Sequence, residues 1–121
     1  MTPEQMRDRT KAFALAVIKF VQSLPNDKVS RVLGYQLLKS GTSTGANYRA
    51  ATRAQSRAAF VAKMAIVEEE ADETAYWLEL LVAADIVPRS SVAGLLREAD
   101  EVVAITVSSI KTARGYHVRH T

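Results

Sequence analysis

Residues 34–81 decide the fold of this chain: GYQLLKSGTSTGANYRAATRAQSRAAFVAKMAIVEEEADETAYWLELL. The second half of this stretch places apolar or small residues at steps of three and four, which is the pattern of an amphipathic helix. The first half keeps the same period, but its inward positions change from apolar to small and polar. These positions are Leu33, Leu37, Ser40, Thr44, Asn47 and Ala51. We therefore predict two long helices, at about residues 28–54 and 56–84, that pack against each other.

Two glycines, Gly41 and Gly45, lie inside the first of these helices. Each costs about 1 kcal/mol relative to alanine in a helix interior. That cost indicates that a neighbouring helix approaches closely at this point, or that the helix bends. A loop at residues 41–45 is the alternative interpretation. The apolar period stays in phase on both sides of the glycines, which favours one continuous helix.

Two further helices flank this central pair. Thr2 and Gln5 form the pattern of a capping box for a helix at about residues 3–24. Its inward stripe is Met6, Thr10, Phe13, Val17, Phe20 and Leu24. A fourth helix is expected at about residues 91–114, and Gly115 is expected to end it, leaving a basic tail at residues 115–121. The expected caps of the other helices are Asn26 or Asp27, Ser56, and Ser90 or Ser91.

Short connections between long helices make neighbours antiparallel. We therefore predict a single all-α domain over residues 1–121, an antiparallel up-down-up-down four-helix bundle. The chain has no cysteine, so disulfides and thiolate metal sites are excluded. No apolar run reaches the roughly 20 residues that span a bilayer, and the charged start of the sequence does not fit a signal peptide. We expect a cytoplasmic protein that has no membrane partner.

The net charge of +3 conceals a strong asymmetry along the sequence. Residues 1–63 carry 11 lysines and arginines against three acids, whereas residues 64–101 carry two against ten. Such segregation suits basic helices that lie beside acidic ones, within one subunit or between subunits. It also suits a basic face that binds an anionic partner.

The acids at residues 68–73 raise the question of a metal site, because four-helix bundles hold carboxylate-bridged metals. Such sites need a Glu-x-x-His pair on each of two helices. Here both histidines, His117 and His120, lie in the C-terminal tail. We therefore expect no metal and no cofactor. We also expect no enzymatic activity, because no nucleophile and base accompany the carboxylates.

Glu70 and Glu73 fall on a stripe that also contains Ile66 and Trp77. A half-buried carboxylate there needs a hydrogen-bond or charge partner. A structural polar network that fixes helix register is one interpretation, and an acid–base pair is the other. The network is expected to comprise Ser40, Asn47, Glu70 and Glu73.

Arg49, Arg53 and Arg57 recur at four-residue intervals, on a face rotated away from Asn47. We interpret them as part of a phosphate-contacting surface. Its full expected set is Arg49, Arg53, Arg57, Lys63, Lys111, Arg114 and Arg119. The alternatives are a solvated stripe, or ion pairs to the acids of a neighbouring subunit. Tyr48 is the nearest aromatic residue, so base stacking is not strongly indicated.

Several runs of this sequence resemble one known family. They are residues 36–40 (QLLKS), 42–51 (TSTGANYRAA), 56–57 (SR), 60–64 (FVAKM) and 70–81 (EADETAYWLELL). Together they resemble the four-helix-bundle family also called the 23S rRNA intervening-sequence protein family, over about residues 33–87. The resemblance departs from the family pattern Asn-Tyr-Arg-Glu-Ala at Ala50, where the family usually has an acid.

The resemblance implies a small bacterial protein of the cytosol whose relatives form ring-shaped homopentamers. It also implies similarity to the accessory protein of diversity-generating retroelements, which binds nucleic acid and a reverse transcriptase. No established activity accompanies the family. We therefore expect a non-enzymatic homo-oligomer, preferably a pentameric ring, that binds RNA or DNA through a basic surface. The alternative is a scaffold that binds a protein partner and no nucleic acid.

Overall fold

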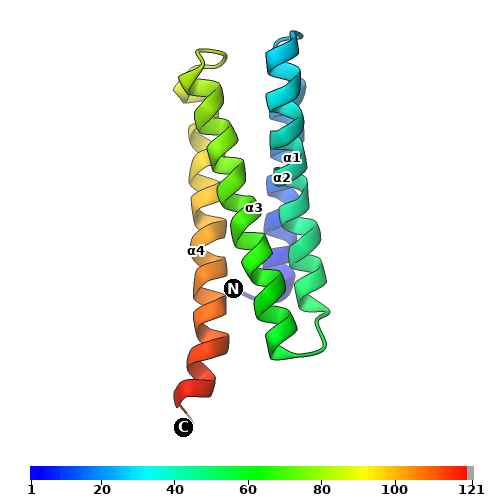
Figure 1. The fold of residues 1–121 in the computed structure, drawn as a ribbon, viewed down its shortest axis with the longest axis vertical. Helices are drawn as coiled ribbons and strands as arrows, with labels where there is room; N and C mark the ends of the chain where they lie inside the picture. Colours follow the sequence, from blue (N-terminus) through cyan, green and yellow to red (C-terminus); the bar gives the residue numbers. More distant parts are fainter. Residues whose placement is uncertain (120–121) are drawn as a thin grey trace.

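The computed structural model describes the backbone of residues 1–119 and the side chains of residues 1–115. Four helices follow one another: α1 (Pro3–Gln22), α2 (Lys28–Thr52), α3 (Arg57–Ala83) and α4 (Arg89–Arg119). They run up, down, up and down, and each packs mainly against its neighbours in the sequence (Figure 1). The predicted antiparallel four-helix bundle is confirmed.

The first three helices begin at the residues whose side chains can cap them. Thr2 and Gln5 form the expected capping box, in which the Thr2 hydroxyl accepts from the Gln5 amide and the Gln5 side chain accepts from the Thr2 amide. Asp27 accepts from the Ser30 amide at 2.9 Å, and Ser56 accepts from the Ala59 amide at 3.0 Å. These contacts satisfy amides that a helix start leaves without a partner.

The Asp27 cap predicts a pH effect on stability. The hydrogen bond from the Ser30 backbone, with a second from the Ser30 hydroxyl, lowers the pKa of Asp27 below its usual value. Its contribution to stability is therefore complete above the unfolded pKa of about 4 and is lost as pH falls through the folded pKa. Asp27→Asn keeps a cap acceptor that does not titrate. Urea unfolding at a series of acidic pH values should show a shallower loss of stability for this variant, and identical pH slopes would contradict the prediction.

The fourth helix differs from the expectation at both ends. It begins at Arg89, so Ser90 and Ser91 lie inside its first turn instead of capping it. The Ser91 hydroxyl donates to the Pro88 carbonyl at 2.8 Å. At the other end the helix continues through Gly115 to Arg119. An added Cβ at Gly115 would meet no atom within 4 Å, so this glycine is neither required by packing nor used as a stop.

The core contains most of the predicted inward positions. Phe20, Leu24 and Leu33 are half-buried, and α2 buries Tyr48 where Asn47 was expected. The polar core residues are threonines and serines whose hydroxyls bond within the bundle. Four threonine hydroxyls donate to carbonyls four residues earlier in their own helices: Thr10, Thr44, Thr74 and Thr106. Polar residues are tolerated in this core because these bonds satisfy them.

Helix α2 is continuous through both of its glycines, so the alternative of a loop at residues 41–45 is wrong. Gly41 packs directly on α1. A Cβ added there would lie 2.8 Å from Val17 Cγ1 and 2.9 Å from Val17 Cγ2. At Gly45 an added Cβ would lie 3.3 Å from the Thr10 carbonyl oxygen. The glycines therefore permit the close approach of α1 and α2 that their positions predicted.

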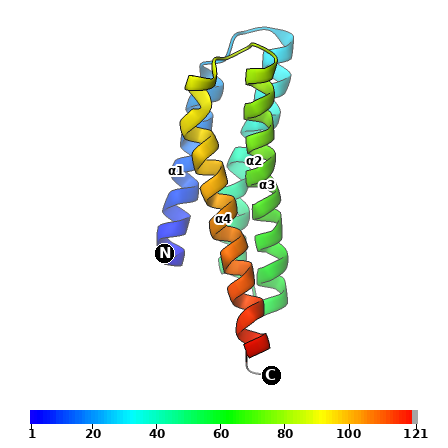
Figure 2. The same ribbon diagram turned by 90° about the vertical axis from the view of Figure 1, so that its left-hand side faces the viewer.

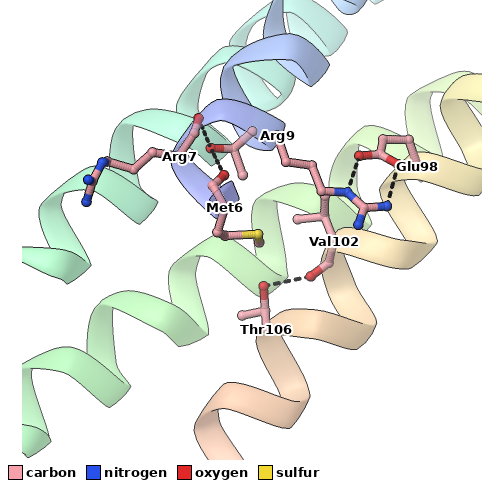
Figure 3. Close-up of polar contacts among 7 residues, drawn as sticks. Met6, Arg7, Arg9, Glu98, Val102 and Thr106 are labelled. Atoms are coloured by element: carbon pink, nitrogen blue, oxygen red, sulfur yellow. Dashed lines mark hydrogen bonds and ion pairs between the residues drawn. The ribbon is translucent and has the colours of Figure 1, made fainter. Parts of the chain in front are cut away.

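Helices α1 and α4 complete the bundle through a less extensive contact. The C-terminal turns of α4 extend beyond the start of α1 (Figure 2). Arg9 of α1 joins Glu98 of α4 by two hydrogen bonds, Nε to Oε2 at 2.6 Å and Nη2 to Oε1 at 2.8 Å (Figure 3). This two-point geometry is the strong form of an arginine–carboxylate pair, although both side chains remain about 30% exposed or slightly less.

Candidate nucleic-acid interface

An open groove runs between α1 and α2 on the outer face of the bundle. Its volume is about 680 Å³. Positions three and four residues apart on each helix line it, because such residues share one helix face. Those of α1 are Arg7, Asp8, Thr10, Lys11 and Ala14, and those of α2 and its C-terminal end are Thr42, Gly45, Ala46, Arg49, Thr52 and Arg53.

Small residues make this groove open. Ala14, Gly45 and Ala46 have little or no side chain, so they leave a depression in the surface between the two helices. The close approach at Gly45 also brings the backbone of α1 to the groove. Long cationic side chains surround this depression. Small residues therefore form the floor of the groove, and charged side chains form its rim.

The charge of the groove is strongly positive. Arg7, Lys11, Arg49 and Arg53 supply four cations, whereas Asp8 supplies the single carboxylate. All four cationic residues are exposed. Among residues 1–115, the one salt bridge joins Arg9 to Glu98, outside the groove. The four cations are therefore not paired with carboxylates of residues 1–115, and we call this site the cationic groove.

Tyr48 lies in the core and cannot offer its ring to a base. It is only 6% exposed, and burial raises the pKa of its hydroxyl above the usual value, while the charge of Arg7 acts in the opposite direction. The exposed aromatic residue of α2 is Tyr35, at 62%. Tyr48 is next to Arg49 in the sequence, but Tyr35 is the tyrosine of α2 that reaches the surface.

Of the predicted phosphate-contacting residues whose side chains are described, Arg49 and Arg53 line the groove. The idea that Arg57 shares their helix face is wrong, because α2 ends at Thr52 and Arg57 begins α3 after a turn. Lys63 is half-buried on α3, and Lys111 and Arg114 are exposed on α4, which does not line the groove. The side chain of Arg119 lies outside the described residues.

Two groove cations, Arg7 and Lys11, were not among the predicted site residues. Their signal was present in the sequence, since they lie four residues apart and fall between the inward positions Met6, Thr10 and Phe13. Which face of α1 borders α2 depends on the rotation of the helix about its axis. A periodic pattern identifies the buried face, but it does not say which neighbour flanks each edge of that face.

The expected polar network divides into two parts. Asn47 Nδ2 donates to Glu70 Oε1 at 2.5 Å, which joins α2 to α3 at a half-buried position. In the core, the hydroxyls of Ser40 and Thr74 lie 2.9 Å apart. Glu73 is not part of either contact. It is exposed, and it accepts from Trp77 Nε1 at 3.1 Å on its own helix.

This difference between neighbouring carboxylates predicts unequal effects on stability. Glu70→Ala removes a charge-assisted contact between helices and leaves the Asn47 amide without its partner, so we expect a loss of about 1–2 kcal/mol. Glu73→Ala removes an exposed contact within one helix and should change stability by less than about 0.5 kcal/mol. Urea unfolding of both variants measures this. Equal losses would contradict the network as the structure shows it.

Neither a metal site nor a membrane span is evident in the described part of the chain. No three His, Cys, Asp or Glu side chains there gather into a group that could hold a metal ion. No helix there is both long enough and apolar enough to cross a membrane.

Comparison with known proteins gives the family of this bundle. The sequence profile described as 23S rRNA-intervening sequence protein matches residues 4–108, which include part or all of each helix. The chain belongs to this family. A comparison with proteins of curated function found no match.

A solved structure supports the same assignment of the 23S rRNA-intervening sequence protein family. It is a protein with unknown function from the S23 ribosomal protein family of Bacteroides thetaiotaomicron. The two chains share 39% identity with a TM-score of 0.82, and the match covers 88% of this chain and 98% of the other. The likeness therefore extends over nearly the whole bundle. It brings no activity with it, so function has to be argued from the surface.

Proposed function

We propose that this protein is a non-enzymatic nucleic-acid-binding module whose contact surface is the cationic groove. The observation that carries the proposal is the placement of four exposed cations around one opening that contains a single carboxylate. Phosphate groups are the natural partners of such a surface, because each lysine or arginine that contacts a phosphate releases condensed counterions. Among the residues whose side chains the structure describes, no histidine lines the groove, and the one carboxylate there has no partner suited to acid–base chemistry.

Ala50 supports this proposal. In the family pattern an acid usually follows the residue that matches Arg49, and here that position is alanine. An acid at position 50 would lie three residues from Arg53, within reach of an ion pair on a helix surface. Its absence leaves the groove cations available for an external anion.

The test is fluorescence anisotropy of labelled single-stranded and duplex RNA and DNA, titrated with protein at several salt concentrations. Four phosphate contacts to a single strand predict a slope of log K against log salt of about −3. Affinity should then fall about 50-fold between 50 and 200 mM salt. Flat titrations at low salt would overturn the proposal.

We also propose that the protein self-associates, with the pentameric ring as the preferred assembly. The support is charge complementarity between cations of α1 and α2 outside the groove, such as Lys19, Lys28 and Arg31, and the exposed face of α3, which carries Glu69, Asp72, Glu73 and Glu79. A head-to-tail interface can place one subunit's basic surface on the next subunit's acids. Light scattering at low and high salt gives the mass directly, and a monomer at low salt would contradict self-association.

A protein scaffold is the second candidate function. The observation in its favour is the same α3 face, where Ile66 and Tyr76 are exposed beside the acids. A partner that is recovered in a pulldown after nuclease treatment, together with flat anisotropy titrations, would favour this candidate over nucleic-acid binding.

A further inference from the structure

The exposed face of α2 continues beyond the cationic groove, toward the N-terminal end of the helix. Thr42 and Arg49 line the groove, and Tyr35 precedes Thr42 by the same seven-residue step. Seven residues complete nearly two helical turns and return to the same face within about 20°. Tyr35 therefore lies on the groove side of α2, roughly 10 Å beyond Thr42 and roughly 20 Å beyond Arg49 along the helix axis.

The side chains around Tyr35 combine apolar surface with a cation. Tyr35 is 62% exposed, and one turn away Val32 is 53% exposed. Lys39 is also exposed, and it precedes the groove residues Ala46 and Arg53 by steps of seven residues. Along the helix axis it therefore lies between Tyr35 and the groove. On α1, Leu15 follows the groove residue Ala14 and is 57% exposed, and it lies at the level of Thr42, because Gly41 packs on Val17 and Gly45 lies close to Thr10. The surface changes from cations at one end to an aromatic and aliphatic platform at the other.

The ring of Tyr35 is available to stack. Within the described side chains the one aromatic pair joins Tyr76 to Trp77 on α3, at 5.0 Å between ring centroids, so Tyr35 has no aromatic partner there. Its ring is largely exposed, so a planar ligand can reach it. Every nucleobase has a flat face that stacks on such rings, whereas the bases of a duplex are already stacked on each other.

We infer that this surface binds single-stranded nucleic acid in preference to duplex, with phosphates at the cationic groove and a base stacked on Tyr35. The inference rests on the proposed function and adds the class of ligand. Aromatic stacking beside a positive groove is the common arrangement for binding a single strand with little sequence preference. The distance from Arg49 to Tyr35 allows a strand of several nucleotides to contact both ends. A second copy of the chain is the competing occupant of the platform, and Lys39 within it favours the anionic ligand.

The experiment compares a labelled single strand of about 12 nucleotides with the corresponding duplex, for RNA and for DNA, at one salt concentration. The wild-type protein should bind the single strand at least about tenfold more tightly. Tyr35→Ala should weaken single-strand binding about tenfold and leave its salt slope unchanged, because stacking releases no counterions. Tyr35→Phe should retain the affinity. Val29→Ala, which removes an exposed apolar side chain in the first turn of α2 that does not line the groove, is the control and should leave the affinity for the single strand unchanged.

The outcomes separate this inference from the proposed function. Equal binding of single strand and duplex, with no effect of Tyr35→Ala, overturns the inference and leaves phosphate binding at the groove intact. A loss of oligomer mass on Tyr35→Ala also overturns it, because the platform is then an interface between copies. Absence of binding to every nucleic acid overturns both.

Discussion

Reversing two charges in the cationic groove, Arg49→Glu together with Arg53→Glu, is expected to lower the affinity for a single strand by on the order of 100-fold at about 0.1 M salt. The variant removes two of the four cations around the opening and puts two carboxylates in their place. With two phosphate contacts left, the slope of log K against log salt should shrink from about −3 to about −1.4. Anisotropy titrations at several salt concentrations give both quantities.

A matched variant controls for net charge. Arg89→Glu together with Arg97→Glu makes the same charge change on exposed residues of α4, which does not line the groove. This control should retain most of the affinity. Arg49 lies in the last turn of α2, where glutamate costs about 0.3–1 kcal/mol of helix stability, so thermal melts should accompany the titrations. Equal losses of affinity in both double variants would show a general charge effect and contradict the groove.

Local chemistry explains why so much of the fold was predictable from the sequence. Thr2 with Gln5, Asp27 and Ser56 each carry a capping signal that needs no tertiary information, and the structure confirms them. The stripe of α3 was also predictable because Met64, Val67 and Leu78 repeat at helical spacing and all are buried. Connections too short for any other arrangement then make neighbouring helices antiparallel.

The candidate site was less predictable because it lies between helices. Arg49 and Arg57 look like members of one series in the sequence, yet the turn after Thr52 places them on different helices. Arg7 and Arg49 line the same groove because the two glycines of α2 let α1 approach closely at one particular rotation. Gly115 lies inside α4 although glycine often ends a helix, because the residues on both sides of it continue the helical turn.

The basic and acidic parts of the sequence lie on different helices of the bundle. The basic first half of the chain forms α1 and α2, and the dense acids of residues 68–73 lie on α3. Among residues 1–115 the Arg9–Glu98 pair is the one salt bridge, so most of the basic and acidic side chains are not neutralised inside the subunit. They remain on surfaces where a nucleic acid or a second subunit can reach them, and this links the fold to the proposed function.

The contact between α1 and α2 predicts the largest effect on stability. Gly41→Leu is expected to reduce the free energy of unfolding by about 3 kcal/mol. A Cβ at position 41 would already lie 2.8–3.0 Å from three atoms of Val17, and the rest of a leucine has to enter the same space. Val17 is β-branched and fully buried, so it cannot rotate away at low cost. Urea unfolding followed by circular dichroism measures the loss.

Gly94→Leu on α4 is the matched control, because an added Cβ there meets no atom within 4 Å. It replaces glycine in an exposed helix and should raise stability by about 0.5–1 kcal/mol. Gly41→Ala should fall between these variants, since its steric cost is partly offset by the same gain in helix propensity. Gly41→Ala is also the variant for the nucleic-acid titrations. If the added methyl group displaces α1, Arg7 and Lys11 move away from Arg49 and the affinity should fall. If Gly41→Leu unfolds at the wild-type urea concentration, α1 and α2 are not held at the close distance that shapes the groove.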